Sequence, residues 1–222
     1  MTSRRRLLTC FSVASLVALL AAGCRRSSSA DAGDRNAAFW VWFTSHSAEI
    51  ATIERADEPI ADALHDQLRK VRSELTFEMG PKAVPREIIV SADGMRAAFP
   101  AVTSLVGAAP AMSGWKVIAF RQRKPGFVIT YEGVKVSRDD VRMTTSPEPA
   151  GKTAVKLYVP GLTPANKKQI EGACLLLLDA TLGEYDVETR LGAIDIDALP
   201  TTNLERMKAL SELPAIIDAT KR

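Results

Sequence analysis

The chain has 222 residues, of which 46% are hydrophobic and 25% are charged, and this composition excludes collagen-like, low-complexity and wholly disordered proteins. The formal net charge is +3, but three of the 29 basic residues are Arg4, Arg5 and Arg6 in a leader without acids, which leaves 26 basic against 26 acidic residues. No nucleic-acid partner is expected, because such a partner needs a basic patch or stripe.

The leader carries the clearest motif. Three arginines precede an apolar core over 7–20, which is typical of a signal peptide and too short and one-sidedly flanked for a membrane span. Its end, Leu-Ala-Ala-Gly before Cys24, resembles a bacterial lipobox. This resemblance implies removal of residues 1–23 and attachment of acyl chains such as palmitate to Cys24, which would hold the protein on a membrane. An ordinary secretory signal that leaves Cys24 as a free thiol is the alternative.

The route of export and the membrane are predicted less directly. The segment 3–8, Ser-Arg-Arg-Arg-Leu-Leu, resembles a twin-arginine signal, and general secretion remains the other route. An aspartate directly after the cysteine would resemble an inner-membrane retention signal, but this position holds Arg25. The sequence therefore predicts a lipid anchor in the bacterial cell envelope, on the outer membrane facing the periplasm.

The mature chain is expected to contain a tether and one folded unit. Residues 24–36 are small and polar and are predicted to form a flexible tether, while residues 37–222 are predicted to form a single domain. Cys10 leaves with the leader, so Cys174 is the one thiol left beside Cys24 and no intramolecular disulfide is expected.

Apolar periodicity predicts the elements of this domain. Helical spacing favours helices over 39–53, 57–75, 100–106, 163–182 and 213–220. Alternation and β-branched runs favour strands over 75–79, 87–91, 115–120, 127–132, 141–145, 154–159 and 190–197. The pair 115–120 and 127–132 is interpreted as a hairpin with a basic loop. The order predicts an α+β fold, a mainly antiparallel mixed sheet of about six or seven strands with helices packed on one face.

Several short motifs carry a resemblance. They are Phe-Trp-Val-Trp-Phe (39–43), Leu-Thr-Phe-Glu (75–78), Val-Ser-Ala-Asp-Gly (90–94), Ala-Pro (109–110), Trp-Lys-Val-Ile-Ala-Phe (115–120) and Leu-Gly-Glu-Tyr-Asp-Val-Glu (182–188). Through them the chain from 39 to about 213 resembles an uncharacterised family of bacterial proteins. The resemblance implies one folded unit and carries over no catalytic residue.

Acidic residues within these motifs are the candidate site. Glu184, Asp186 and Glu188 alternate, and an extended segment would align them on one side, where they could bind a hard cation or act as acid and base. A structured turn with solvated or locally bonded acids is the alternative interpretation. Glu78 lies on a strand and Asp93 is expected to cap a helix, and convergence of Glu78, Asp93, Glu184 and Asp186 in one pocket would mark a functional site.

The remaining candidate residues have structural interpretations, some of them with a functional alternative. His46 lies on an apolar stripe and is interpreted as a buried, hydrogen-bonded histidine, with an acid-base or metal role as alternatives, and His65 as a surface residue. Cys174 lies on a helical stripe and is interpreted as buried, although a nucleophile paired with His46 is the functional alternative. No metal or cofactor motif is present in the sequence.

Two surface features are also open. The aromatic segment 39–43 is interpreted as core, or as a docking surface near the membrane. The basic loop 121–124 is interpreted as a solvated hairpin tip, or as a contact for lipid phosphates or an acidic partner. The sequence predicts a non-catalytic binding module for an unknown protein or envelope ligand, and a hydrolase-like enzyme with an acidic pocket is the alternative.

Overall fold

The computed structural model describes residues 17–124, 126 and 128–220. Within these residues it contains six α-helices and nine strands, which confirms the α+β class. The strands do not form one sheet of six or seven but three small sheets of three, two and four strands. The leader residues 1–16, with the three arginines, lie outside the described residues, as do Pro125 and Phe127.

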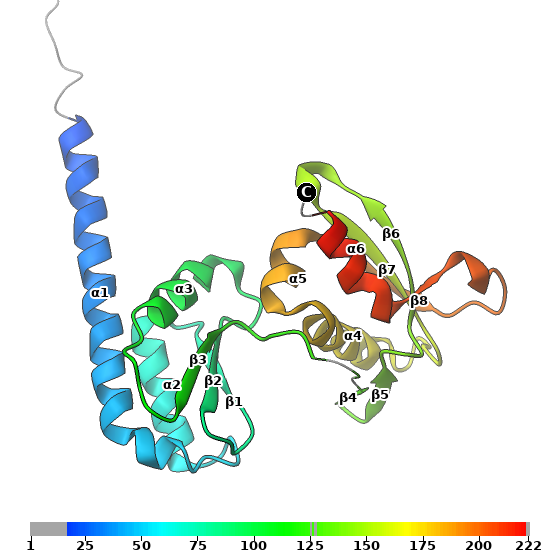
Figure 1. The fold of residues 1–222 in the computed structure, drawn as a ribbon. Helices are drawn as coiled ribbons and strands as arrows, with labels where there is room; N and C mark the ends of the chain where they lie inside the picture. The colour runs from blue at the N-terminus through cyan, green and yellow to red at the C-terminus, as the bar shows by residue number, and fades with distance from the viewer. Residues whose placement is uncertain (1–16, 125, 127, 221–222) are drawn as a thin grey trace, which may run out of the picture.

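Helix α1 (Val17–Ile50) is the longest element and projects from the body of the molecule (Figure 1). It includes residues 24–36, which the sequence predicts as a flexible tether. No proline interrupts this stretch, and its one glycine, Gly33, costs only about 1 kcal/mol in a helix. The folded body begins by Asn36, which is buried and donates a hydrogen bond to Ser104 Oγ at 2.9 Å.

The N-terminal lobe comprises residues 36–120. Besides the end of α1 it contains α2 (Pro59–Val71), β1 (Thr76–Met79), β2 (Arg86–Ser91), α3 (Phe99–Gly107) and β3 (Trp115–Ala119). Strand β2 is central, antiparallel to β1 and parallel to β3, with α3 as the crossover between the two parallel strands. The stripe of Ile60, Leu64 and Leu68 that predicts α2 is buried in this lobe.

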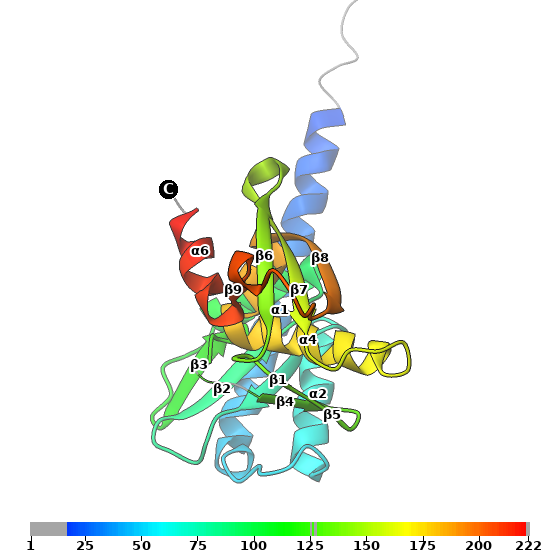
Figure 2. The ribbon, with the colours of Figure 1, turned by 90° about the vertical axis from the view of Figure 1, so that its right-hand side faces the viewer.

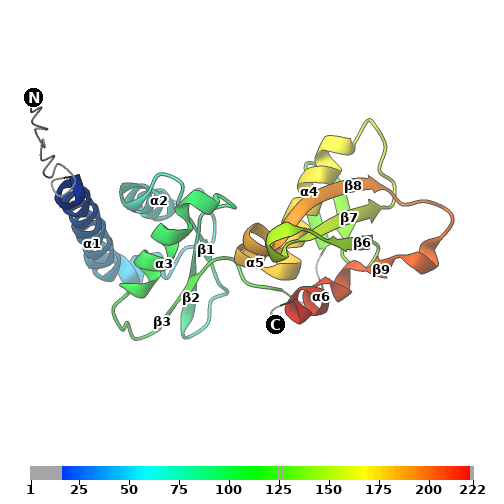
Figure 3. The same cartoon turned by 90° about the horizontal axis from the view of Figure 1, so that it is seen from above.

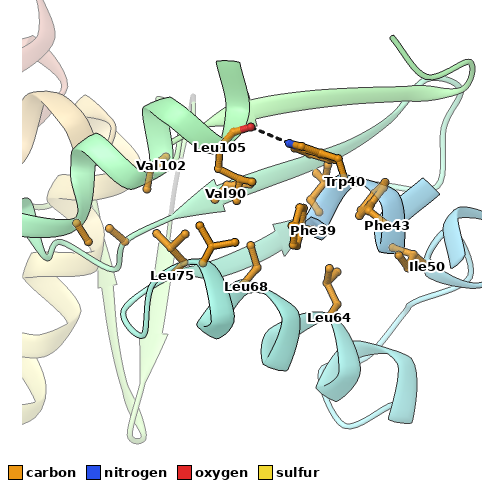
Figure 4. Close-up of a cluster of buried hydrophobic side chains, with 14 of the residues drawn as sticks. Phe39, Trp40, Phe43, Ile50, Leu64, Leu68, Leu75, Val90, Val102 and Leu105 are labelled. Carbon is orange, nitrogen blue, oxygen red and sulfur yellow. Dashed lines mark hydrogen bonds between the residues drawn. The ribbon is translucent and has the colours of Figure 1, made fainter. Parts of the chain in front are cut away.

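The aromatic segment at 39–43 packs into the core of this lobe (Figure 4). Phe39, Trp40 and Phe43 are buried, with the rings of Phe39 and Trp40 in an edge contact at 4.8 Å. The indole Nε1 of Trp40 donates a hydrogen bond of 2.8 Å to the carbonyl oxygen of Leu105. Core packing is therefore confirmed for these three rings, while Val41 between them is 72% exposed.

The C-terminal lobe comprises residues 128–220 (Figure 2). Its elements are β4 (Val128–Tyr131), β5 (Val134–Ser137), β6 (Arg142–Pro147), β7 (Thr153–Val159), α4 (Lys167–Leu182), α5 (Glu184–Arg190), β8 (Leu191–Ala198), β9 (Lys208–Ala209) and α6 (Leu213–Ala219). The larger sheet has the order β8-β7-β6-β9, and β4 pairs only with β5. A second hydrophobic cluster fills this lobe, separate from the cluster of the N-terminal lobe.

The predicted hairpin between 115–120 and 127–132 is wrong. Strand β3 pairs in parallel with β2, and β4 pairs with β5, so the basic residues at 121–124 form a linker between the lobes (Figure 3). The Phe120 N–H still bonds the carbonyl oxygen of Val90 at 2.8 Å, but the chain then leaves the sheet. The Lys124 N–H bonds the carbonyl oxygen of Ala180 on α4 at 2.7 Å. Strands β3 and β4 therefore pair with β2 and β5 instead of with each other.

Cys174 is fully buried on α4, as its place on the apolar stripe predicts. Burial, with a smaller effect of the Glu171 carboxylate, raises the pKa of its thiol to about 12. The thiolate is the reactive form of cysteine, so this environment suppresses nucleophilic chemistry at neutral pH.

We expect an aromatic disulfide reagent at pH 7 to modify native Cys174 at least about tenfold more slowly than the chain unfolded in guanidinium, because folding removes both access and thiolate. Absorbance of the released thiol measures both rates. Equal rates in the two states would contradict the burial of Cys174.

Candidate functional site

Gly183 joins two helices at the centre of the candidate acidic segment. It ends α4 and precedes α5 with φ 81° and ψ 146°, a conformation that side chains disfavour. A β-carbon there would also lie 3.0 Å from the carbonyl oxygen of Arg121. The segment after it is helical rather than extended, so Asp186 lies on the opposite side of the helix from Glu184 and Glu188. The predicted alignment of three acids on one side is therefore wrong.

Glu184 is fully buried between the lobes. Its Oε1 accepts hydrogen bonds from the backbone N–H groups of Ala92 at 3.0 Å and Gly94 at 3.1 Å, and its Oε2 accepts one from Arg121 at 3.2 Å. Its own N–H donates to the carbonyl oxygen of Arg121 at 3.0 Å. The interpretation of Glu184 as a solvated or locally bonded turn residue is wrong, because its partners lie far away in sequence.

The guanidinium of Arg121 gathers the other acids of the predicted cluster. Its Nε donates to Glu78, its Nη2 lies 2.8 Å from Asp93, and its Nη1 lies 3.7 Å from Asp179. Burial opposes the charge of Arg121, but the hydrogen bonds with Asp93 and Glu78 outweigh it and raise its pKa above the usual value. Glu78 and Asp93 thus converge on the guanidinium of Arg121, while Glu184 binds the backbone of the same residue.

Asp186 belongs to a neighbouring ion-pair group. Arg123 Nη2 donates to Asp186 at 2.6 Å, and its Nη1 donates to Asp218 of α6 at 2.8 Å. Hydrogen bonding to Asp218 raises the pKa of Arg123 despite partial burial, and Asp186 adds to the effect. The basic loop expected as a solvated hairpin tip therefore lies at the junction of the lobes.

An aromatic contact closes the same junction. The ring of Tyr185 on α5 lies 5.2 Å from Phe120 and 5.7 Å from Phe99, and these two rings lie 4.6 Å apart. Phe99 and Phe120 belong to the buried cluster of the N-terminal lobe. We call the whole arrangement the lobe junction, formed by 92–94, 120–123 and 183–186 together with Glu78, Phe99, Asp179 and Asp218.

Sequence reasoning missed Asp179, the remaining acid near Arg121. It lies with Glu78 on the wall of a cavity of about 160 Å³. Burial raises the pKa of Asp179 to about 6, while Arg121 lowers it and Glu184 raises it further. The available signal was an acid inside the apolar run of α4, directly after the buried Leu177 and Leu178.

The histidines lie outside the lobe junction. His46 is half-buried, stacks on Trp42 at 4.5 Å, and its Nδ1 is 2.8 Å from the Trp42 carbonyl oxygen, so its hydrogen bonding is confirmed but full burial is not. His65 packs on Phe77 at 4.5 Å, and burial lowers its pKa. Among residues 17–124, 126 and 128–220, no group of three or more His, Cys, Asp or Glu residues is arranged to hold a metal ion.

No protein-family model matches the chain, and comparisons with curated proteins and with solved structures find no match. The helices of the described residues include none that is long and apolar enough to cross a membrane.

Replacing Glu184 with Gln should lower the free energy of unfolding by about 2–3 kcal/mol, because the amide nitrogen would face a backbone N–H and leave a buried donor unpaired. Urea denaturation followed by circular dichroism measures the change. Glu205→Gln is the matched control, since that carboxylate is 73% exposed. Equal stability of the two variants would show that the buried carboxylate does not hold the lobes.

Replacing Asp179 with Asn should stabilise the protein above pH 7. The folded state keeps the Asp179 proton up to a pH near 6, against a usual value of 3.8, so the free energy of unfolding falls as the pH rises through this window. We expect a gain of about 2 kcal/mol at pH 8 that shrinks as the pH falls toward 4. Thermal melting across pH measures it, with exposed Asp195→Asn as control. A gain that is independent of pH would contradict this cause.

Proposed function

We propose that this chain is a bacterial lipoprotein whose α+β body binds a protein or envelope ligand without catalysing a reaction. Acyl chains on Cys24 would attach it to the outer membrane, facing the periplasm. Two lines of argument support the proposal, one from the leader sequence and one from the lobe junction.

The leader supports the anchor. A basic start, an apolar stretch, small residues and a cysteine follow one another in the order that lipoprotein processing requires. Each acyl methylene buried in the bilayer contributes about 0.8 kcal/mol, so more than one chain gives lasting attachment. Because α1 continues from Cys24 to Asn36, the body would stand about 18 Å from the anchor at the rise of a helix.

The hydrogen bonds and ion pairs of the acids at the lobe junction support the proposal that the protein is not an enzyme. Glu78 and Asp93 are bound by Arg121, Asp186 is bound by Arg123, and Glu184 is enclosed by three backbone N–H groups. A general acid or base needs a carboxyl group within reach of a reacting atom. These four acids instead hold the two lobes together, which favours a stable binding scaffold.

One observation favours the alternative, a hydrolase-like enzyme. Asp179 has a raised pKa and shares a small cavity with Glu78, and perturbed carboxyls in cavities are candidates for acid-base work. The Asp179→Asn variant separates the two functions. A hydrolytic activity that disappears in this variant while the fold persists would favour the enzyme.

Replacing Cys24 with Ala should abolish labelling by a palmitate analogue and release the protein from membranes, because the acceptor thiol is lost. Metabolic labelling and membrane fractionation of the full chain measure both effects. Cys10→Ala is the matched control, since it removes a thiol from the leader and should leave labelling intact. Membrane attachment that persists without Cys24 would reject the anchor.

A further inference from the structure

Two open cavities with shared wall residues lie in the N-terminal lobe, near the C-terminal end of α1 and the loop before β2. Both of these segments are at the foot of the lobe in Figure 1. Their volumes are about 550 and 600 Å³, which is within the range of small-molecule sites. Lys82 and Arg86 line both cavities. Glu78, which binds Arg121, lines the first cavity, whereas no residue of the lobe junction lines the second.

Arg86 is a buried cation that forms no ion pair with any described residue. Arg86 is only 6% exposed, and its guanidinium donates hydrogen bonds to the carbonyl oxygens of Ala51 and Ile53. Its Nε is buried and has no hydrogen-bond partner. A buried charge that lacks a partner is costly, so the site favours a ligand that supplies negative charge.

The nearby acids are committed to other cations. Glu54 pairs with Lys82, Glu87 pairs with Lys116, and Glu78 pairs with Arg121. Within the part of the chain that the structure describes, no carboxylate forms an ion pair with Arg86. The charge on Arg86 is thus a local surplus rather than one half of an internal pair.

The second cavity is the better fit for an anion. Lys82 and Arg86 are its only charged wall residues among those described, and Glu54 already offsets the charge on Lys82. The surplus is close to one positive charge, which matches a carboxylate better than a phosphate dianion. Much of the remaining wall is apolar, formed by Ala48, Ala51, Ala83, Val84 and Trp115. Val84 on the loop is 90% exposed.

From this surplus charge and apolar wall we infer that the second cavity binds a small monocarboxylate with an apolar body. The carboxylate lies against Arg86 and Lys82, and the apolar body lies against Trp115, Ala48 of α1 and Ala51 just after the helix. This inference rests on the proposed binding role and names the chemistry of its ligand.

Isothermal titration of the full-length protein in nonionic detergent tests the inference, with sodium 4-phenylbutanoate as the probe and neutral 4-phenylbutanamide as its matched control. The acid should bind at least about tenfold more tightly than the amide, because only the acid compensates Arg86. Equal affinities, or no binding of the acid, would overturn the inference. Stronger binding of inorganic phosphate would overturn the assignment to a carboxylate.

A charge-matched pair of variants locates the site. Ala83→Asp places an anion on the exposed loop and should weaken binding of the acid about tenfold, while Ala83→Asn adds a side chain of the same shape and should retain affinity within about twofold. Arg86→Met should abolish binding, but it also removes bonds to two carbonyl oxygens, so the Ala83 pair decides the question if that variant does not fold. Equal affinities of the Asp and Asn variants would place the ligand elsewhere.

A blocked tripeptide, acetyl-Ala-Ala-Phe, separates two sources of the same chemistry. Tighter binding of 4-phenylbutanoate supports a free apolar acid, whereas tighter binding of the tripeptide overturns that assignment in favour of a peptide C-terminus. If neither ligand binds, the cavity is not a carboxylate site. The proposed anchor at Cys24 is not affected by this result, because membrane attachment is measured separately.

Discussion

The carboxylate of Glu184 is buried and accepts hydrogen bonds from N–H groups of the turn at 92–94 and of the linker at Arg121, which lie far from it in the chain. Because an unpaired buried charge would be costly, the turn at 92–94, the linker at Arg121 and the start of α5 can hold their positions only together. Gly183 permits this approach, since a side chain there would meet the Arg121 carbonyl. The positions of both lobes depend on this one contact and on the pairs around it.

The same constraint divides the charged residues of the protein into two kinds. At the lobe junction, Arg121 and Arg123 each form ion pairs with at least two acids, and these pairs link the lobes. Arg86 is as buried as the core residues around it but is held only by carbonyl oxygens. A buried positive charge that forms no ion pair with a described carboxylate therefore lies at the foot of the N-terminal lobe, away from the acidic residues that stand out in the sequence.

Local patterns predicted the longer elements, but they missed the short β5, α5 and β9 and failed on long-range strand partners. The stripes of α2 and α4 and the alternation in β7 and β8 were readable because each repeats over several residues. The linker resembled a hairpin loop because a Pro-Gly pair separates two strands. The sequence does not show whether those strands pair with each other or with more distant strands. Helix α5 has only seven residues, and its alternating acids imitated a strand. The partners of Glu184 are backbone N–H groups, which no side-chain pattern reveals.

The two hydrophobic clusters are contiguous in the chain, one before Arg121 and one after it. A local opening that separates the lobes would part Tyr185 from Phe99 and Phe120 but leave most of each cluster packed, so its free energy is smaller than that of global unfolding. The amide protons of Ala92, Gly94 and Arg121 are protected by a group that such an opening carries away with α5. Their hydrogen exchange reports movement between the lobes, while amides within β2 and β7 report unfolding of each lobe.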